Sequence, residues 1–442
     1  MRLNSQIVFC IVVVISCLSM IECKMGSRIY CSGSLSSVEL FSQYISNYAL
    51  RNDDVTIIYA GMSVDEINAD VYIADCSAYD RAIPQIYMIS YGLIQFPIVG
   101  QAIVIIYNVP GLSSHNMIID RETLGRIWTG NIRKWNDIQI QNLNPDIASQ
   151  LPNETITLGY NDAYYLSISE IMQLALRNFS EEFANAHTIA GGKFGNMIPA
   201  KQGYAIDAGE ASESRIDWVK NTPFSLSFAD FATVYPRNVS YMHMYNKAGK
   251  LVEPNITTVQ SAMADFKEIY TTNDFTIDIF DASGENSWPI SWVNYISMTS
   301  TFQQADCIRT KELLDFIAWF YMNNEIAEII KEYQYYPLDN TIKKIAIDNM
   351  YNVTCNGKVS QEHQYLIAFG SPLSIMASWP NTWASSMTTV KYYASLSDQA
   401  IELQKTFSGD FGITIKDFDK NKYLSSTMED IGVSHLAAFN IV

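Results

Sequence analysis

The chain has 442 residues, of which 48% are hydrophobic and 17% are charged, and its formal net charge is −17. This length exceeds one typical domain and the apolar content is ample for a buried core, so at least two compact units are expected. The negative charge argues against nucleic acid and anionic membrane surfaces as partners. An anion site would therefore have to be local, built from backbone N–H groups and hydroxyls.

Residues 1–23 have the character of a secretory signal peptide. Arg2 supplies the positive start, and Ile7–Met20 is an apolar run that is short for a membrane span. A signal anchor is the alternative interpretation. The sequence therefore predicts a secreted protein or one on the extracellular face of the cell surface, delivered by the secretory pathway.

Two strand–turn–helix segments follow. Residues 28–49 read RIYCSGSLSSVELFSQYISNYA, with a Ser/Gly-rich turn between a strand pattern and a helix pattern. Residues 55–75 read VTIIYAGMSVDEINADVYIAD and repeat this order. Strands that alternate with helices predict an α/β fold whose sheets are covered on both faces.

The next segment, Ile94–Asp137, is the most informative of the chain. It opens with the apolar run IQFPIVGQAIVIIYN, and the Val-Pro-Gly that follows is expected to stop a strand. A short helix comes next, with Asp120 as its N-cap and Gly130 at its C-terminal end. Further along, the spacing of apolar residues predicts one long helix over Arg309–Tyr333.

Four cysteines lie outside the signal region: Cys31, Cys76, Cys307 and Cys355. An even number in an exported chain indicates two disulfides, with three pairings open. Metal binding is the poorer interpretation, because the cysteines are scattered and form no Cys-x-x-Cys pair.

Five N-glycosylation sequons are present, and behind a signal peptide they favour a glycoprotein of a eukaryotic secretory route. A bacterial periplasmic origin is the alternative. The sequon asparagines are Asn153, Asn178, Asn238, Asn255 and Asn352.

Several segments resemble the phosphate-binding proteins that serve ABC transporters, the PstS type. That family carries a strand of the form QFP…G…V…YN-P-GL, matched by Ile94–Leu112, and a helix ending G-I-KWND, matched by Gly130–Asp137. Trp288-Pro289-Ile290 and Tyr336-Pro337-Leu338 match its WPI and Y-PL segments. The resemblance implies an α/β, two-lobed type 2 periplasmic-binding-protein fold.

The same resemblance implies domain boundaries. Residues 24–357 would form one solute-binding domain, with its first lobe at about 24–103 and 291–357 and its second lobe at about 104–290. The family fold brings the first two strand ends together, which favours the pairings Cys31–Cys76 and Cys307–Cys355.

Residues 363–442 repeat the start of this domain. Ala368–Ser374 (AFGSPLS) opens like Gly33–Ser37 (GSLSS), and the final HLAAFNIV parallels AIVIIYNV at Ala102–Val109. Similarity at domain length indicates tandem copies, with chance similarity as the alternative. We therefore expect a partial, incomplete second copy at 363–442, and a chain that is a fragment of a longer tandem protein.

In the resembling family the ligand lies between the lobes, at turns whose backbone N–H groups and hydroxyls point inward. The family's first turn, G-A-G-[AS]-[ST]-F-P, corresponds to Cys31–Ser37, where the hydroxyl position falls on Leu35. The candidates for that hydroxyl are Ser34 and Ser36, on either side of Leu35.

The family's second turn bears a serine and then the segment DFGASD. Ser63 is the candidate for the serine, and Asp75 aligns with the aspartate that accepts a proton from the bound anion in the family. An aspartate at a strand end is also an ordinary cap or turn residue, so both roles stay open.

The third turn, R-x-D-G-S-G-T in the family, departs most from the pattern. Residues 160–166 read YNDAYYL, so Asp162 is kept, Tyr160 stands at the arginine and Tyr164 at the serine. A phenol does not replace a bidentate guanidinium, and bulky side chains block close approach of the backbone. We therefore predict that phosphate binds this copy weakly or not at all. The tyrosines could stack on an apolar or sugar-like ligand, or fill a cleft that binds nothing.

Enzyme signatures are missing from the sequence, which has no H-E-x-x-H, G-x-S-x-G or P-loop motif. We predict a non-enzymatic solute-binding protein with lost or altered phosphate binding, no cofactor, no metal and no nucleic-acid partner. Its ligand would be a small molecule or an anion. The alternative is a degenerate ligand-sensing or adhesive ectodomain of a larger tandem-repeat surface receptor, with partners outside this chain.

Overall fold

The computed structural model describes residues 27–50, 52, 55–63, 66–67, 74–112, 117–162, 167–266, 278–302, 307–350, 352–355 and 358–359, and two short strands at 415–416 and 440–441. The predicted signal peptide at 1–23 and the candidate Tyr164 lie outside these residues. So does the predicted second copy at 363–442, except for its strands β16 (Ile415–Lys416) and β17 (Asn440–Ile441), which pair with each other.

The first lobe is built on a sheet with strand order β2-β1-β3-β11-β4, to which the short β13 adds. Strand β1 is parallel to both β2 and β3, whereas β11 is antiparallel to both β3 and β4. All four residues of β3 are buried, as expected for a strand covered on both faces. The strands are β1 (Ser27–Ser34), β2 (Val55–Met62), β3 (Cys76–Tyr79), β4 (Leu93–Asn108), β11 (Ser291–Thr299) and β13 (Tyr336–Pro337).

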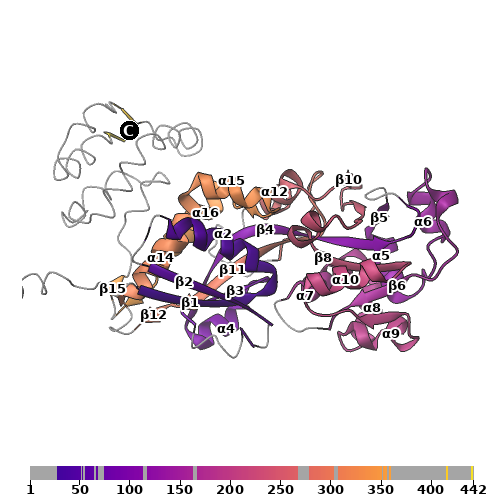
Figure 1. Ribbon diagram of the computed structural model, residues 1–442, viewed down its shortest axis with the longest axis horizontal. Helices are drawn as coiled ribbons and strands as arrows, with labels where there is room; N and C mark the ends of the chain where they lie inside the picture. Colours follow the sequence, from indigo (N-terminus) through magenta and orange to yellow (C-terminus); the bar gives the residue numbers. More distant parts are fainter. Residues whose placement is uncertain are drawn as a thin grey trace, which may run out of the picture.

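Helices cover this first sheet on both sides (Figure 1). They are the short η1 (Leu35–Ser37), α2 (Val38–Ala49), α4 (Gln85–Tyr91), α14 (Cys307–Met322), α15 (Asn324–Glu332) and α16 (Asn340–Met350). A small sheet of order β12-β14-β15 lies beside α14 and consists of β12 (Thr301–Phe302), β14 (Thr354–Cys355) and β15 (Lys358–Val359).

The second lobe is built on a sheet of order β4-β8-β6-β7 and carries a separate small sheet of order β10-β9-β5. Its strands are β5 (Ile118–Asp120), β6 (Thr157–Tyr160), β7 (Ala205–Asp207), β8 (Ser225–Asp230), β9 (His243–Tyr245) and β10 (Leu251–Val252). Its α-helices are α5 (Arg121–Thr129), α6 (Ile138–Leu143), α7 (Ile168–Phe179), α8 (Glu181–Ile189), α9 (Ile198–Lys201), α10 (Ser212–Asn221), α11 (Phe231–Val234) and α12 (Ile256–Asp265). Three short 3-10 helices complete it: η2 (Ala148–Gln150), η3 (Phe194–Asn196) and η4 (Tyr235–Arg237).

Strand β4 belongs to both lobes. Its first part, 93–102, pairs with β11, and its second part, 103–108, pairs with β8. At the transition the Ile103 backbone N–H donates to the Ile290 carbonyl at 2.9 Å, and Trp288 Nε1 donates to the Ile103 carbonyl at 2.9 Å. The segment that enters the second lobe and the segment that leaves it therefore run side by side, as Figure 1 shows for β4 and β11.

The ends of α5 lie where the sequence predicts them, whereas the helix predicted over Arg309–Tyr333 differs from the structure. The Asp120 side chain accepts a hydrogen bond from Thr123 N at 2.6 Å, and Gly130 ends α5 with φ of 83°. The prediction of one helix over Arg309–Tyr333 is wrong, because the segment divides into α14 and α15. Asn323 ends the first and caps the second by accepting from Ile326 N at 3.1 Å, since its side chain competes for backbone groups.

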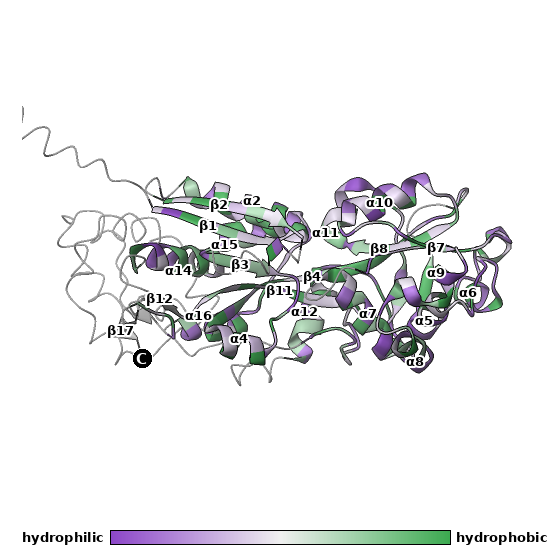
Figure 2. Cartoon of the chain, turned by 90° about the horizontal axis from the view of Figure 1, so that it is seen from below, coloured by the Kyte–Doolittle hydropathy of each residue, from purple (hydrophilic) through white to green (hydrophobic). Residues whose placement is uncertain are grey.

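The two disulfides have the predicted pairing. Cys31–Cys76 joins residues that face each other on β1 and β3, with Cα atoms 4.6 Å apart, and Cys307–Cys355 joins the start of α14 to β14 at 5.5 Å. The central strand β4 is mostly hydrophobic, whereas α10 shows hydrophilic residues at the surface (Figure 2). Among the described helices, none has both the length and the apolar character that a membrane span requires.

Candidate functional site

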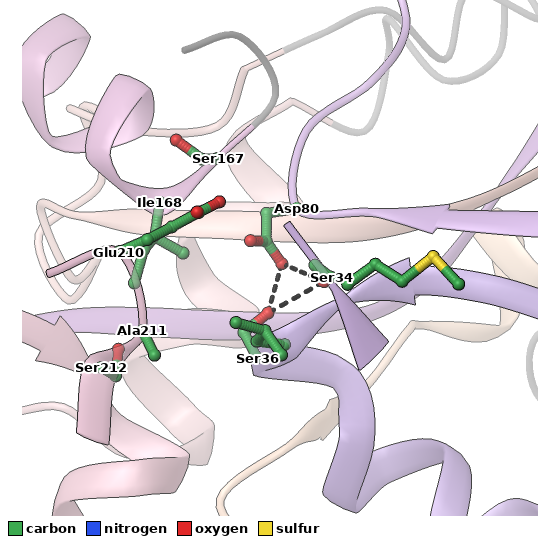
Figure 3. A pocket seen from close by; sticks show the side chains of 10 residues that line it. Ser34, Ser36, Asp80, Ser167, Ile168, Glu210, Ala211 and Ser212 are labelled. Atoms are coloured by element: carbon green, nitrogen blue, oxygen red, sulfur yellow. Dashed lines mark hydrogen bonds between the residues drawn. The ribbon is translucent and has the colours of Figure 1, made fainter. Parts of the chain in front are cut away.

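A cavity lies where turns of the first lobe face helix starts of the second lobe (Figure 3). The first lobe contributes the turn after β1, the end of β2 and the residue after β3. The second lobe contributes the starts of α7 and α10. The lining residues are Ser34, Leu35, Ser36, Met62 and Asp80 from the first lobe, and Ser167, Ile168, Glu210, Ala211 and Ser212 from the second.

The turn after β1 is shaped by close packing at Gly33. A Cβ at this position would lie 2.3 Å from the Tyr59 hydroxyl and 2.7 Å from the Ala78 Cβ, so only glycine fits. The Tyr59 hydroxyl also donates to the Ser34 carbonyl at 2.9 Å. The chain then enters η1 and α2 directly, which holds the hydroxyls of Ser34 and Ser36 at the cavity.

Asp80 is the most deeply placed charged residue of the lining, with 4% of its surface exposed. Its Oδ1 accepts hydrogen bonds from Ser34 Oγ at 2.8 Å, from Asn294 Nδ2 at 3.0 Å, and from Ser36 Oγ. Burial raises the pKa of Asp80 to about 6, although the donors from Ser36, Ser34 and Asn294 oppose that rise.

Asn294 connects the cavity to the strands that cross between the lobes. Its Nδ2 donates to Asp80 and, at 3.2 Å, to Ser37 Oγ, and its Oδ1 accepts from Gln101 Nε2. Asn294 lies on β11 and Gln101 on β4. Asp80 is therefore one hydrogen bond away from β11 and two hydrogen bonds away from β4.

The start of α10 is held in place by Arg215, which is fully buried. Its guanidinium donates to the carbonyls of Phe228 at 2.8 Å, Gly209 at 2.9 Å and Glu210, and to Ser212 Oγ at 3.1 Å. Burial lowers the pKa of Arg215 to about 10. This role of Arg215 was not predicted from the sequence, because it depends on how α10 packs on β8.

An ion pair joins the lobes beside the cavity. Arg81, which follows Asp80, binds Asp278 through Nε and Nη2, both at 2.7 Å. Its Nη1 lies 3.0 Å from Glu170 Oε1, in the first turn of α7. Both partners of the Arg81–Glu170 pair have 21% of their side-chain surface exposed, so water screens the pair only in part.

The structure brings some of the candidate site residues to the cavity and leaves others apart. Ser34 and Ser36 line it, whereas Asp75 lies before β3, where it accepts from Tyr30 N at 2.8 Å and pairs with Arg309 at 3.0 Å. Ser63 donates through its N–H and hydroxyl to Glu66, and its neighbour Met62 takes the place in the lining.

The missed residue of this lobe is Asp80. The segment DFGASD of the resembling family has an aspartate at each end, and Asp75–Asp80 reads DCSAYD. The sequence assignment used the first aspartate, whereas the second one faces the cavity. Ligands of parallel sheets bind at the carboxyl ends of the strands, and Asp80 is the aspartate at the carboxyl end of β3. This rule could have identified Asp80 from the sequence.

Asp162 and Tyr160 lie at the end of β6 and contact η3 of the second lobe. Asp162 Oδ2 accepts from Gly195 N at 2.9 Å, and the Tyr160 ring lies 6.2 Å from the Phe194 ring, centroid to centroid. Neither is among the described residues that line the cavity. No lysine, arginine or histidine is among those lining residues either.

Comparisons with known proteins identify two sets of similar sequences. Proteins R818 and R831 of Acanthamoeba polyphaga mimivirus, provisionally named serine/threonine-protein kinase/receptor, are 48% and 46% identical over 95% of this chain, which spans 26% of each of them. The phosphate-binding protein PstS of Methanocaldococcus jannaschii is 26% identical over 51% of this chain and 59% of its own length. That of Xylella fastidiosa is 25% identical over 69% and 80%.

Solved structures give the same fold. A high-affinity periplasmic phosphate-binding protein, PfluDING, bound with phosphate, matches 78% of this chain and 100% of its own with a TM-score of 0.55 at 15% identity. A DING protein matches 75% and 99% with a TM-score of 0.56 at 14% identity. No model of a protein family matches the chain.

Proposed function

The chain is homologous in sequence to the PstS phosphate-binding proteins and has a type 2 periplasmic-binding-protein fold, and we propose that it is an extracellular solute-binding module whose ligand is not phosphate. The observation that carries the proposal is the cavity itself. Ser34, Ser36 and Asp80 of one lobe face the starts of α7 and α10 of the other, next to the crossing strands. A small ligand there would contact both lobes at once.

An extracellular location is supported by the disulfides, because such bonds persist mainly in oxidising compartments. The sequons remain a prediction that the fold permits: Asn153, Asn178, Asn238 and Asn352 are exposed. Asn255 is partly buried and caps α12 by accepting from Thr258 N at 3.1 Å.

The mimivirus relatives favour a receptor as the setting of this module. Their names describe kinases or receptors, and the chain spans only 26% of each. We propose that the residues described here supply ligand sensing in such a protein and carry out no catalysis themselves. The solute-binding and receptor hypotheses are then compatible: the module belongs to a receptor, and binding of a ligand changes the relative position of its two lobes.

A ligand screen tests this function. Small anions, amines, polyols and sugars would each be added to the full chain, and the melting temperature measured. A bound solute should raise the melting temperature by mass action, and Ser36→Leu, which fills the cavity, should abolish the rise. If no compound stabilises the protein, or if Ser36→Leu leaves every shift unchanged, the cavity is not a solute site.

Phosphate is expected to bind weakly. Tyr160 occupies the position of the clamp arginine, and no described cation lines the cavity, so a dianion would have to displace water without a bidentate partner. Titration calorimetry with inorganic phosphate should give a dissociation constant weaker than about 1 μM, which corresponds to about −8 kcal/mol. Micromolar or tighter binding would contradict the prediction.

A further inference from the structure

We propose that the cavity selects a small ligand with a protonated amine, which donates to Asp80 and Glu210 from between the lobes. This proposal rests on the proposed solute-binding function and specifies its ligand class. It departs from phosphate binding because the described lining carries negative side chains and no positive one.

The first argument is the state of the Asp80 carboxylate. All three of its donors, Ser34, Ser36 and Asn294, bind the same oxygen, Oδ1. The other oxygen, Oδ2, accepts no hydrogen bond from a described residue and points toward the starts of α7 and α10 (Figure 3). Because Oδ2 is not an enclosed, unpartnered atom, it can accept a hydrogen bond from a donor in the cavity, and an ammonium group supplies such a donor.

The second argument is charge. Glu210 contributes a second carboxylate from the opposite lobe. Arg215 adds no cation to the lining, because it is fully buried and donates to Ser212 and to backbone carbonyls. Two carboxylates in a partly desolvated cavity disfavour an anion and favour a cation, since charges interact more strongly there than in water.

The helix starts do not reverse this preference. The N-terminus of a helix favours an anion, but polar or negatively charged side chains of the protein already lie at the N-terminal ends of α7 and α10. Ser167 Oγ accepts from Glu170 N at 3.4 Å, the Glu170 carboxylate lies in the first turn of α7, and Glu210 immediately precedes the start of α10. These carboxylates meet the positive helix ends without a ligand anion.

The remaining lining limits the size of the ligand and suits a short carbon chain. Leu35, Met62, Ile168 and Ala211 are apolar, and the hydroxyl of Ser36 can accept a further hydrogen bond. An ammonium group has three donors and needs several acceptors in one place, to which the two carboxylates and this hydroxyl contribute.

Three compounds of nearly the same shape test the proposal: ethanolamine, ethylene glycol and glycolate, which are cationic, neutral and anionic at neutral pH. Each would be titrated calorimetrically into the full chain, with inorganic phosphate as a further anion. Ethanolamine is expected to bind at least about tenfold more tightly than ethylene glycol, a difference of about 1.4 kcal/mol. Glycolate and phosphate are expected to bind more weakly than either.

Variants connect the preference to the named residues. Asp80→Asn keeps the shape of the side chain and should remove the preference for ethanolamine, and Glu210→Gln, at a half-buried position, should reduce it in part. Glu213→Gln is the matched control, because Glu213 lies in the first turn of α10, shortly after Glu210, is not among the lining residues and pairs with Arg237 at 3.5 Å. Circular dichroism and melting temperature establish that each variant folds.

The outcomes separate the ligand class from the function. No ethanolamine binding, or binding that neither Asp80→Asn nor Glu210→Gln alters, overturns the amine proposal. Tighter binding of glycolate or phosphate that depends on Asp80 also overturns it, but leaves solute binding in place. Loss of every ligand response, including that of the broader screen, removes the proposed function itself.

Discussion

At the scale of single residues, Asp80 is the group whose properties depend most on its surroundings. Burial raises its pKa to about 6, from an ordinary value of 3.8, and the nearby Asp230 contributes to the rise. The groups that face it include Tyr59, Asp230 and the buried Arg215, which interact with it electrostatically. The three hydrogen bonds to Oδ1 stabilise the charged form of Asp80 although its side chain is buried.

The pKa of Asp80 predicts a pH dependence of stability. Because the folded state binds this proton more tightly than the unfolded state, the stabilisation is present below about pH 4 and is lost as pH rises through about 6. The loss amounts to roughly 2–3 kcal/mol at about 1.4 kcal/mol per pH unit. Urea unfolding from about pH 4 to 7 should therefore show wild type losing stability relative to Asp80→Asn. Parallel pH curves for the two proteins would show that Asp80 does not titrate in this range.

At the scale of elements, the cavity is assembled from the beginnings of helices. Helix α2 begins after β1 and η1, and α7 and α10 begin after β6 and β7. The Arg81–Glu170 pair joins the residue after Asp80 to the first turn of α7, so it connects the two lobes at the cavity. Arg81 also holds Asp278 through two hydrogen bonds, which fixes the guanidinium in place for Glu170.

Removing this inter-lobe pair should favour a more open arrangement of the lobes. Arg81→Gln deletes this pair together with the Arg81–Asp278 pair, which also links Arg81 to the second lobe. A partly exposed ion pair contributes about 0.5–1 kcal/mol, enough to change the ratio of closed to open molecules a few-fold. Small-angle X-ray scattering without ligand should show a larger radius of gyration for Arg81→Gln.

Arg237→Gln provides the comparison for that measurement, because Arg237 pairs with Glu213 at 3.5 Å, both within the second lobe. It should leave the radius of gyration at the wild-type value. Equal radii for wild type and Arg81→Gln would mean that the ion pairs of Arg81 do not control the arrangement of the lobes.

For the molecule as a whole, two crossing segments and two disulfides organise the fold. The chain passes between the lobes along β4 and returns at Ile290, just before β11, and Asn294 of β11 and Gln101 of β4 connect these segments to Asp80. Cys31–Cys76 links neighbouring strands of the first lobe, whereas Cys307–Cys355 ties α14 to β14 across 48 residues of sequence. The second link therefore joins a helix to a small sheet, in which β14 also pairs with β12 and β15.

Loss of the second disulfide should lower the stability of the first lobe. For a loop of 48 residues the chain-entropy model gives about 4 kcal/mol, with smaller values if the unfolded chain retains structure. The variant with Cys307→Ser and Cys355→Ser should show this decrease in urea unfolding under oxidising conditions. Reductant should destabilise wild type by at least as much. A variant as stable as wild type would assign the disulfide no structural role.

Features that depend on neighbouring residues or on long matched segments could be predicted from the sequence. The α/β class, the two-lobed fold and the ends of α5 followed from strand–helix alternation, from the PstS-like segments and from the Asp120 and Gly130 caps. The disulfide pairs followed from the fold that those segments imply. Capping and periodicity act within one or two turns of chain, so they can be read locally.

Which polar groups contact one another could be learned only from the three-dimensional packing of the chain. Asp75 and Asp80 stand at opposite ends of β3, and strand register and packing determine that Asp80 faces the cavity. Arg215 at the start of α10 and the Arg81–Glu170 pair depend on contacts between segments that are far apart in sequence. The division of the long helix at Asn323 depended on a side chain that competes with the helix backbone. Packing between distant segments determines such contacts, and the local sequence pattern does not specify that packing.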